Sequence, residues 1–425
     1  MSTAAAQVRA SLPRIRIIDE LCRRLLTARL RRLRRDCLIL QEPDAASTFG
    51  RPSKPELQAT IHIHEPAFYS AVALGGSIGA AESYARGEWT ADDLIAVVRI
   101  LVRNRDVLDA MERGLARFAA PARRALHWLN RNTRAGSRRN IEAHYDLGNE
   151  FFALFLDESL MYSSAVFEAD GDGDLHSAQL AKLDRVCRKL QLRPVDHLLE
   201  VGSGWGSLAI HAAREYGCRV TTTTISPAQY ALACERIRAA GLADRIEVLL
   251  ADYRDLRGRY DKVVSIEMIE AIGWQYYETY FAKVSQLLAP DGLALIQSIT
   301  IADHRYEFAR RSVDFIQKYI FPGSTIPSIG ALCNALMRAS DLRLFHLEDI
   351  GPHYARTLRL WRERFLSRRR DVHALGHSEE FCRLWEFYFS YCEGGFEERA
   401  ISDVQMLLVK PENRRTPLLT PLQQL

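Results

Sequence analysis

From about residue 195 onward, short apolar runs alternate with longer amphipathic segments. The runs have the length and β-branched content of buried strands, and the segments between them have the length of helices. Strands that alternate with helices predict an α/β fold with a doubly wound sheet, in which ligands bind at the carboxyl ends of the strands. The strands are predicted at 197–202, 218–225, 246–252, 261–268, 293–300 and 401–411, and the helices at 205–217, 227–241 and 274–290.

The front of the chain has a different pattern, and we expect a small α+β domain at 1–120. "DCLILQE" and "ATIHIHE" alternate like strands, and "GEWTADDLIAVVRILV" predicts a helix. His62 and His64 share one strand face, but no third ligand is near them in sequence, so no metal site is expected. The remaining parts are predicted to be a basic linker at 121–140, a catalytic domain at 141–412 with a mostly helical insertion at about 300–400, and a tail at 413–425.

The net charge of +4 conceals an asymmetry, because residues 1–140 carry 24 Lys and Arg against 14 Asp and Glu. The densest basic segment, "RRLLTARLRRLRR" (23–35), places Leu26, Leu30 and Leu33 on one helical face. Such a helix lies either on an anionic membrane surface or against its own domain, and the sequence favours neither. The chain carries no signature of a nucleic-acid-binding fold, so no nucleic-acid partner is expected.

The sequence also bears on the compartment. It has no apolar run long enough to span a bilayer, and its N-terminus lacks the pattern of a signal peptide. The eight cysteines include no CxxC pair, which favours reduced thiols. We therefore expect a cytoplasmic protein that attaches peripherally to the inner face of the membrane through its basic front.

The stretch "LLEVGSGWGSLAI" (198–210) carries the clearest chemical signal, because a strand ends in an acid and then in glycines. Gly202 and Gly204 allow a ligand to come close and Gly206 allows close helix packing, but the third glycine fails the dinucleotide spacing. Glu200 would repel a pyrophosphate and attract an ammonium group. The turn therefore predicts S-adenosylmethionine (AdoMet), which carries an ammonium group and a sulfonium.

Two later strand ends complete the predicted cofactor site. Asp252 ends one strand and can accept a hydrogen bond from the adenine amino group. Many nucleotide-binding folds end the second strand in an acid that binds the ribose. Here that strand ends in "TTTTIS", so Thr224 and Gln229 are predicted to bind the ribose hydroxyls.

Several motifs in the right order resemble the cyclopropane-fatty-acyl-phospholipid synthase family, of the mycolic acid cyclopropane synthase type. The front of the chain, with "SIGAAESYARGEWTADDL", is similar to the N-terminal lipid-binding domain of the bacterial enzymes. The resemblance implies an AdoMet-dependent homodimer that adds a methylene across a cis double bond of a phospholipid acyl chain. The motifs are "NIEAHYDLGNEFFALFLDESLMYSSAVF" (140–167), "LLEVGSGWG" (198–206), "TTISPAQ" (223–229), "IEMIEAIG" (266–273), "KYIFPGSTIPS" (318–328) and "GPHYARTL" (351–358).

The resemblance also implies roles for single residues. In this family a bound bicarbonate removes a proton from the added methyl group. Glu270 matches the glutamate that holds the ion, Tyr354 matches a tyrosine beside it, and Ile299 matches a residue that offers its backbone. Tyr145 and Ser163 match positions that line the AdoMet and bicarbonate pockets. The remaining implied cofactor contacts are Ser164, Ser203, Trp205 and Tyr253.

The sequence departs from the family pattern at three positions. Ser163 and Ser203 stand where many members have Cys, which is a small polar exchange. Gln297 stands where the bacterial enzymes have His beside the bicarbonate, and an amide cannot titrate. The product is therefore less firmly implied than the alkylation, and a methyl or methylene branch, or a soluble small-molecule substrate, are the alternatives. Aromatic residues are predicted to wall an apolar slot for the acyl chain: Phe315, Tyr319, Phe321, Trp385, Tyr388 and Phe389.

Overall fold

The structure is a computed structural model, and it divides the chain into two compact units. The first unit is Met1–Ala122 with Ser378–Phe387, and the second is Arg123–His377 with Tyr388–Leu425. Tyr145 and most of the predicted linker lie outside the described residues. Within the described part of the chain, no helix combines the length and apolarity that crossing a bilayer requires. The described residues are 13–51, 53, 55–113, 132–133, 136, 147–168 and 173–418.

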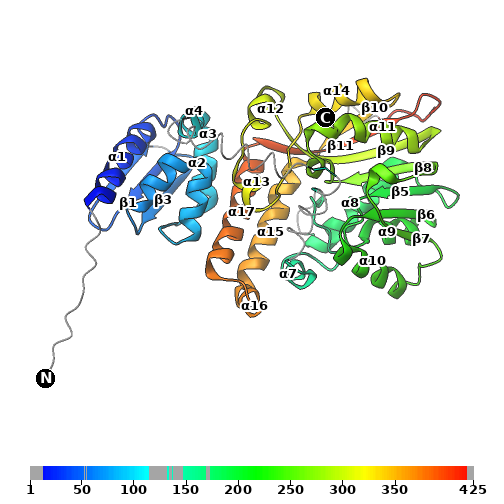
Figure 1. Cartoon of the computed structure of the whole chain (residues 1–425), viewed down its shortest axis with the longest axis horizontal. Helices are drawn as coiled ribbons and strands as arrows, with labels where there is room; N and C mark the ends of the chain where they lie inside the picture. The colour runs from blue at the N-terminus through cyan, green and yellow to red at the C-terminus, as the bar shows by residue number, and fades with distance from the viewer. Residues whose placement is uncertain are drawn as a thin grey trace. The chain divides into compact units, whose positions relative to one another are not determined.

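The first unit packs helices against a small sheet, as the sequence predicts (Figure 1). The strands have the order β2-β1-β3-β4, with β1 parallel to β3 and the other pairs antiparallel. The helix predicted at 87–102 begins only at Leu94, because Asp93 caps it by accepting a hydrogen bond from the Ala96 amide. The elements are α1 (Pro13–Leu30), β1 (Cys37–Gln41), β2 (Ala46–Gly50), β3 (Gln58–Ile63), α2 (Ala67–Ala85), β4 (Trp89–Ala91), α3 (Leu94–Arg103) and α4 (Arg105–Arg113).

The basic helix α1 packs against its own unit through the face that the sequence identified. Leu26, Leu30 and Leu33 are all buried, so these leucines are not available to a membrane. The helix nevertheless has a second apolar face, because Ile17 and Leu21 keep 67% and 57% of their surface exposed. The sequence analysis overlooked this face, since it looked for apolar residues only within the arginine-rich segment.

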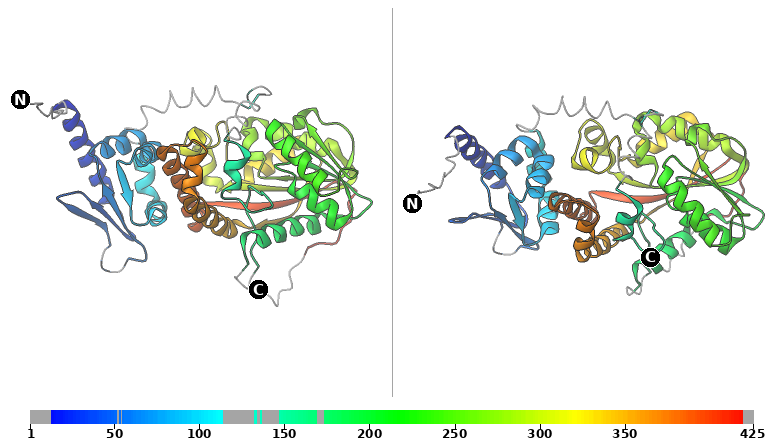
Figure 2. Two further views of the ribbon diagram at one scale, coloured as in Figure 1. Left: turned by 90° about the horizontal axis from the view of Figure 1, so that it is seen from below. Right: turned by 60° about the horizontal axis from the view of Figure 1, so that its bottom comes forward.

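The second unit is built on a seven-stranded sheet with the order β10-β11-β9-β8-β5-β6-β7, which confirms the doubly wound α/β fold. Neighbouring strands from β9 to β7 are parallel, whereas β11 is antiparallel to both β9 and β10. Both views of Figure 2 show β11 in red within this layer. The strands are β5 (His197–Val201), β6 (Arg219–Thr224), β7 (Ile246–Leu250), β8 (Tyr260–Ile266), β9 (Leu288–Ile301), β10 (Arg343–Asp349) and β11 (Ile401–Val409).

The sequence analysis missed β10, which lies inside the region predicted as a mostly helical insertion. Its residues "RLFHLED" are only partly buried because the strand forms an edge of the sheet, so the apolar alternation is weak. The helices of the second unit are α7 (Asn149–Ala153), α8 (Leu175–Leu190), α9 (Ser207–Tyr216), α10 (Pro227–Ala239), α11 (Tyr277–Leu287), α12 (Asp303–Ala309), α13 (Phe315–Tyr319), α14 (Ile329–Ala339), α15 (Gly351–Ser367), α16 (Arg369–Ala374) and, from Tyr388 onward, α17 (Glu379–Glu397).

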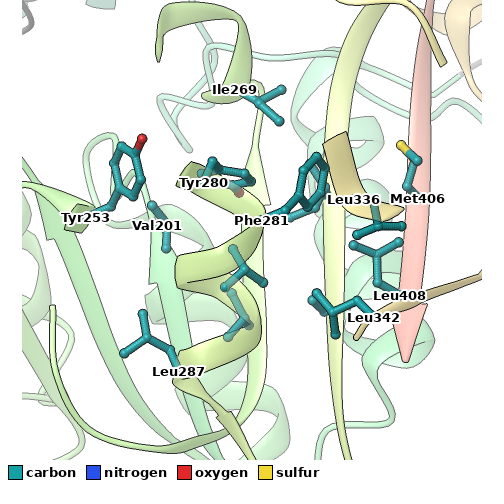
Figure 3. Close-up of a cluster of buried hydrophobic side chains, with 14 of the residues drawn as sticks. Val201, Tyr253, Ile269, Tyr280, Phe281, Leu287, Leu336, Leu342, Met406 and Leu408 are labelled. Atoms are coloured by element: carbon teal, nitrogen blue, oxygen red, sulfur yellow. The ribbon is translucent and has the colours of Figure 1, made fainter. Parts of the chain in front are cut away.

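Helices cover both faces of this sheet, and the strand pleat divides the core into two clusters. Leu199 of β5 packs on the side of α11 and α14, whereas its neighbour Leu198 packs on the side of α8, α9 and α10. Figure 3 shows the first cluster, in which Phe281 of α11 lies among aliphatic side chains of β11 and α14. Because both faces are buried, side chains that leave the strand ends are held by a rigid layer.

We expect Phe281→Ala to destabilise the second unit by about 3–5 kcal/mol, because the ring is fully buried and its loss leaves a cavity. Chemical denaturation monitored by circular dichroism would measure this loss. Leu250→Ala is the matched control, since Leu250 is 48% exposed on β7 and should change stability by no more than about 0.5 kcal/mol. Equal losses in the two variants would contradict the assignment of this core.

Candidate active site

The turn after β5 has a backbone that requires glycine. Gly202, Gly204 and Gly206 have φ angles of 99°, 48° and 87°, which side chains disfavour. The amides of Gly202 and Ser203 donate to one carbonyl of β6, which fixes the turn. A Cβ at Gly202 would lie 3.2 Å from Met268 Cγ, whereas a Cβ at Gly204 would meet no atom within 4 Å. The turn is therefore open at Gly204, where a ligand can approach the backbone.

Glu200 precedes this turn as a buried acid at the carboxyl end of β5. Its carboxylate accepts a hydrogen bond from Thr222 Oγ1 at 2.6 Å. Burial raises the pKa of Glu200 to about 8, although this bond and the charge of Lys182 favour ionisation. A ligand ammonium group would supply the missing positive charge, so the residues present fit the amino-acid end of AdoMet.

Two other residues of the turn have structural contacts of their own. Trp205 is buried, and its Nε1 donates to Asn149 Oδ1 at 2.8 Å while its ring lies 5.3 Å from that of Phe152. This contact fastens α7 to the glycine turn. Ser203 Oγ donates to the Gly204 carbonyl at 2.9 Å. The predicted contact of Trp205 with the cofactor stays a prediction beside this packing role.

The predicted ribose and adenine residues lie at the neighbouring strand ends. Thr224 Oγ1 donates to Gln229 Oε1 at 2.9 Å, so the two predicted ribose ligands already form a pair. Asp252 forms an ion pair with Arg254 at 2.6 Å, so the predicted acceptor for the adenine amino group is partly engaged. Tyr253 is buried against the Tyr280 ring, and burial raises its pKa. These contacts order the strand ends on which the cofactor is predicted to lie.

A carboxylate that the sequence analysis did not single out lies at the centre of the site. Glu267 follows β8 in the left-handed conformation (φ 47°), which is uncommon and costly for a residue with a side chain. Its Oε1 accepts hydrogen bonds from the Ser164 amide and from Gln297 Nε2, both at 2.8 Å. Its Oε2 accepts from the Tyr354 hydroxyl at 2.6 Å. The available signal was the pair of acids in "IEMIEAIG", because a carboxylate in an apolar run is rarely buried without a function.

Glu270 lies close by, in the 3-10 turn Ile269–Ile272. Its Oε1 accepts from Ser298 Oγ at 2.9 Å and from the Ile299 amide at 2.5 Å, while its Oε2 has no hydrogen-bond partner among the described residues. Burial, and then repulsion from Glu267, raises the pKa of Glu270 to about 8. The structure thus brings Glu270, Tyr354, Gln297 and Ile299 together, with Glu267 in their midst.

Two further titratable groups are buried beside this pair. Asp403 of β11 accepts a hydrogen bond from Gln297 Nε2 at 2.9 Å, and burial together with Glu267 raises its pKa well above the usual range. Lys182 of α8 donates to Ser163 Oγ at 2.9 Å. Burial lowers the pKa of Lys182 to about 8, and the charge of Glu267 is the largest opposing influence. Ser163 therefore lies at the site but as the acceptor of a buried ammonium group.

Aromatic rings line one side of this centre. The Tyr354 ring lies 4.5 Å from that of Phe396, and the Tyr162 and Tyr388 hydroxyls are 3.1 Å apart. Of the six aromatics predicted to wall a slot, Tyr319 is 38% exposed and Trp385 belongs to the first unit, and their place in the slot stays a prediction. Phe321, Tyr388 and Phe389 make ring contacts with one another or with Tyr162 and Phe155, and the rings of Phe315 and Tyr319 are 5.9 Å apart. The slot that these residues were expected to wall stays a prediction.

Comparison with known proteins identifies the family. The sequence model of mycolic acid cyclopropane synthetase matches residues 132–406. The chain belongs to this family. It is 40% identical over 369 residues to the tuberculostearic acid methyltransferase UfaA1 of Mycobacterium tuberculosis, covering 83% of each chain. It is 35% identical over 346 residues to the cyclopropane-fatty-acyl-phospholipid synthase of Escherichia coli, covering 81% of this chain and 86% of the relative.

The solved structures agree with this assignment. The mycolic acid cyclopropane synthase CmaA1, complexed with SAH and CTAB, has a TM-score of 0.60 and 33% identity and covers 64% of this chain and 98% of its own. The cyclopropane synthase MmaA2 of Mycobacterium tuberculosis gives the same TM-score at 32% identity, with the same coverage. This member of the mycolic acid cyclopropane synthetase family is therefore an AdoMet-dependent methyltransferase.

We expect Glu200→Gln to weaken AdoMet binding by roughly tenfold to a hundredfold, because a neutral amide cannot form an ion pair with an ammonium group. Isothermal titration calorimetry would measure the affinity. Without AdoMet the variant should gain stability relative to the wild type as the pH rises from about 5 to 8. The raised pKa of Glu200 means that the folded state keeps a proton that the unfolded state releases, so wild-type stability falls across this window. Unchanged AdoMet affinity would contradict the predicted role.

Proposed function

We propose that this enzyme transfers a one-carbon unit from AdoMet to the cis double bond of an unsaturated phospholipid acyl chain and forms a cyclopropane, with Glu267 as the base. The observation that carries the proposal is the environment of the Glu267 carboxylate. Three donors, from Ser164, Gln297 and Tyr354, hold it in one position. Burial raises the pKa of Glu267, and these hydrogen bonds to its ionised form counteract that rise, so that the carboxylate can act as a base.

The same geometry bears on the bicarbonate that the resemblance implies. Tyr354, which was expected to contact that ion, donates to Glu267, and the Ile299 amide donates to Glu270. Two protein carboxylates thus use the donors that a bicarbonate would need. These residues do not fit the ion well, and we assign its role as proton acceptor to Glu267.

The reaction then needs three contributions from the protein. AdoMet supplies the methyl group when bound at the glycine turn. An alkene is a weak nucleophile, so the apolar wall must exclude water and hold the double bond in line with the methyl group. Attack leaves a cation on the second alkene carbon, and the faces of Tyr354 and Tyr162 can stabilise it. Glu267 removes a proton from the added methyl group, and the released C–H electron pair closes the ring onto the cationic carbon.

A second product is favoured by one comparison. The relative that is 40% identical is named a tuberculostearic acid methyltransferase, which points to a branched chain. A hydride shift before deprotonation would place the cation on the carbon that bears the new methyl group. Loss of the same methyl proton to Glu267 would then give an exocyclic methylene. Both products therefore require the same base.

Glu267→Gln should lower the rate of turnover by about 100-fold to 10,000-fold while AdoMet still binds, because the amide cannot accept the proton. Cells expressing the enzyme and fed methionine with a CD3 methyl group provide the test. Lipid mass spectrometry should show a new acyl chain that retains two deuteriums. Resistance to hydrogenation identifies the ring, and sensitivity identifies the methylene.

Glu278→Gln is the matched control, since the Glu278 side chain is 55% exposed on α11 and the variant should keep full activity. Full activity of Glu267→Gln would remove the base assignment. Retention of three deuteriums would mean that no methyl proton is lost, and it would remove both proposed products.

We also propose that the first unit docks on anionic phospholipid through the exposed apolar face of α1. Ile17, Leu21 and Leu25 are spaced by four residues, so they share one face of the helix, and each is at least 36% exposed. Arg24 lies beside them with 77% of its side chain exposed, and it forms an ion pair with Glu20 at 3.0 Å. Apolar side chains next to arginines are typical of a helix lying in the membrane interface.

The double variant Ile17→Ser/Leu21→Ser should bind vesicles of anionic phospholipid about tenfold more weakly, because apolar surface is removed from the contact. Vesicle co-sedimentation would measure the binding. Met337→Ser is the control, because Met337 is 71% exposed in the second unit and should not affect binding. If the double variant and the control bind alike, this face is not the docking surface.

A further inference from the structure

Gln297 is connected to the side chains behind it by a row of hydrogen bonds. Its Nε2 donates hydrogen bonds to the carboxyl groups of both Glu267 (2.8 Å) and Asp403 (2.9 Å). Its Oε1 accepts from Gln405 Nε2 at 3.0 Å, and Gln405 Oε1 accepts from Lys189 Nζ at 2.7 Å. All of these side chains except Glu267 belong to neighbouring strands or to α8, and all lie in the second unit.

The donor and acceptor groups of these side chains determine which atom donates in each hydrogen bond of the row. A lysine ammonium group only donates hydrogen bonds, so it must face the oxygen of Gln405. Gln405 Nε2 then points towards Gln297, which must accept the hydrogen bond with its amide oxygen. The nitrogen of Gln297 is left to face the two carboxylates. Each of its two N–H groups has one carboxylate to serve, and the opposite orientation would place an amide oxygen against them.

We propose that Lys189 and Gln405 are positioning residues that fix the amide orientation of Gln297, so that its two N–H groups face Glu267 and Asp403. The proposal rests on the proposed role of Glu267 as the base. Neither Lys189 nor Gln405 contacts Glu267, so their influence passes through the Gln297 amide.

Several groups face the Glu267 carboxylate, and they determine how much the amide orientation can matter. Tyr354 from α15 and the Ser164 amide donate to it, and the charge of Lys182 from α8 favours its ionised form. Burial is the largest influence that raises the pKa of Glu267, and Glu270 and Asp403 repel a charge there as Glu267 repels theirs. Reversal of the Gln297 amide would remove one donor and add a repelling oxygen. The pKa of Glu267 would therefore rise.

The test compares Gln405→Glu with Gln405→Met. The new glutamate keeps the shape and the contact with Lys189, but its ionised carboxylate would require Gln297 to turn its nitrogen away from the site. Methionine only removes the hydrogen bond by which Gln405 favours one amide orientation of Gln297. We expect the acid limb of the kcat/KM profile to move up by about one pH unit in Gln405→Glu and by much less in Gln405→Met. A purely structural role predicts the reverse order, because glutamate is the closer replacement.

Two further measurements separate the explanations. On a Gln297→Leu background, Gln405→Glu and Gln405→Met should have the same acid limb of the kcat/KM profile. If Gln405→Glu still shifts the profile there, its charge acts through space and the proposal is overturned. Infrared titration of the buried carboxyl groups needs no turnover, and Gln405→Glu should raise the pH at which the Glu267 proton is lost, with Glu267→Gln assigning the band. If Gln405→Glu shows that shift but Glu267→Gln keeps full activity, Glu267 is not the base, and the positioning role of Lys189 and Gln405 stands. No shift would refute the positioning alone.

Discussion

The left-handed backbone at Glu267 is the constraint on which the rest of the site depends. A residue with a side chain adopts this conformation only where its surroundings hold it, and here three donors do so. These donors come from the loop after α7, from β9 and from α15, which are remote in sequence. Their convergence requires the sheet, the cap helix α15 and the preceding loop to be in place. The strained residue therefore couples the geometry of the site to the fold of the second unit.

The buried titratable groups raise a second physical question, since Glu270, Asp403 and Lys182 lie out of water beside Glu267, which is half-buried. Like charges in a dry pocket cannot all remain ionised, and burial raises the pKa of each acid. The one lysine offsets one carboxylate. The two glutamates receive different numbers of hydrogen bonds, however. Three donors bind the carboxylate of Glu267, whereas one oxygen of Glu270 has no partner among the described residues. Ionisation is therefore favoured at Glu267, and the protons remain on its neighbours.

The sequence was sufficient for the sheet and the glycine turn because both are local patterns. Alternating runs predicted β5 to β9, and Glu200 with Gly202 predicted the cofactor turn. It was insufficient for β10, whose edge position weakens the pattern, and for α1, whose exposed apolar face begins before the arginine-rich segment, at Ile17 and Leu21. It also missed Glu267, since a chain shows that an acid is present but not which donors converge on it. The resemblance directed attention to Glu270, three residues further on.

The departure at Gln297 is best understood together with Glu267, because the two side chains form one hydrogen-bonded arrangement. A bound anion beside a histidine can exchange with solvent, and the histidine can change its charge. A carboxylate attached to the backbone cannot leave, and a neutral amide offers two N–H groups without adding charge. The amide suits a site that already contains two carboxylates, because Glu267 and Asp403 each receive one donor. If Glu267 is the base, as proposed, its attachment to the backbone also fixes the direction from which it approaches the cation. Under this proposal, the choice between ring closure and a methylene depends on how the acyl chain lies against a base that does not move.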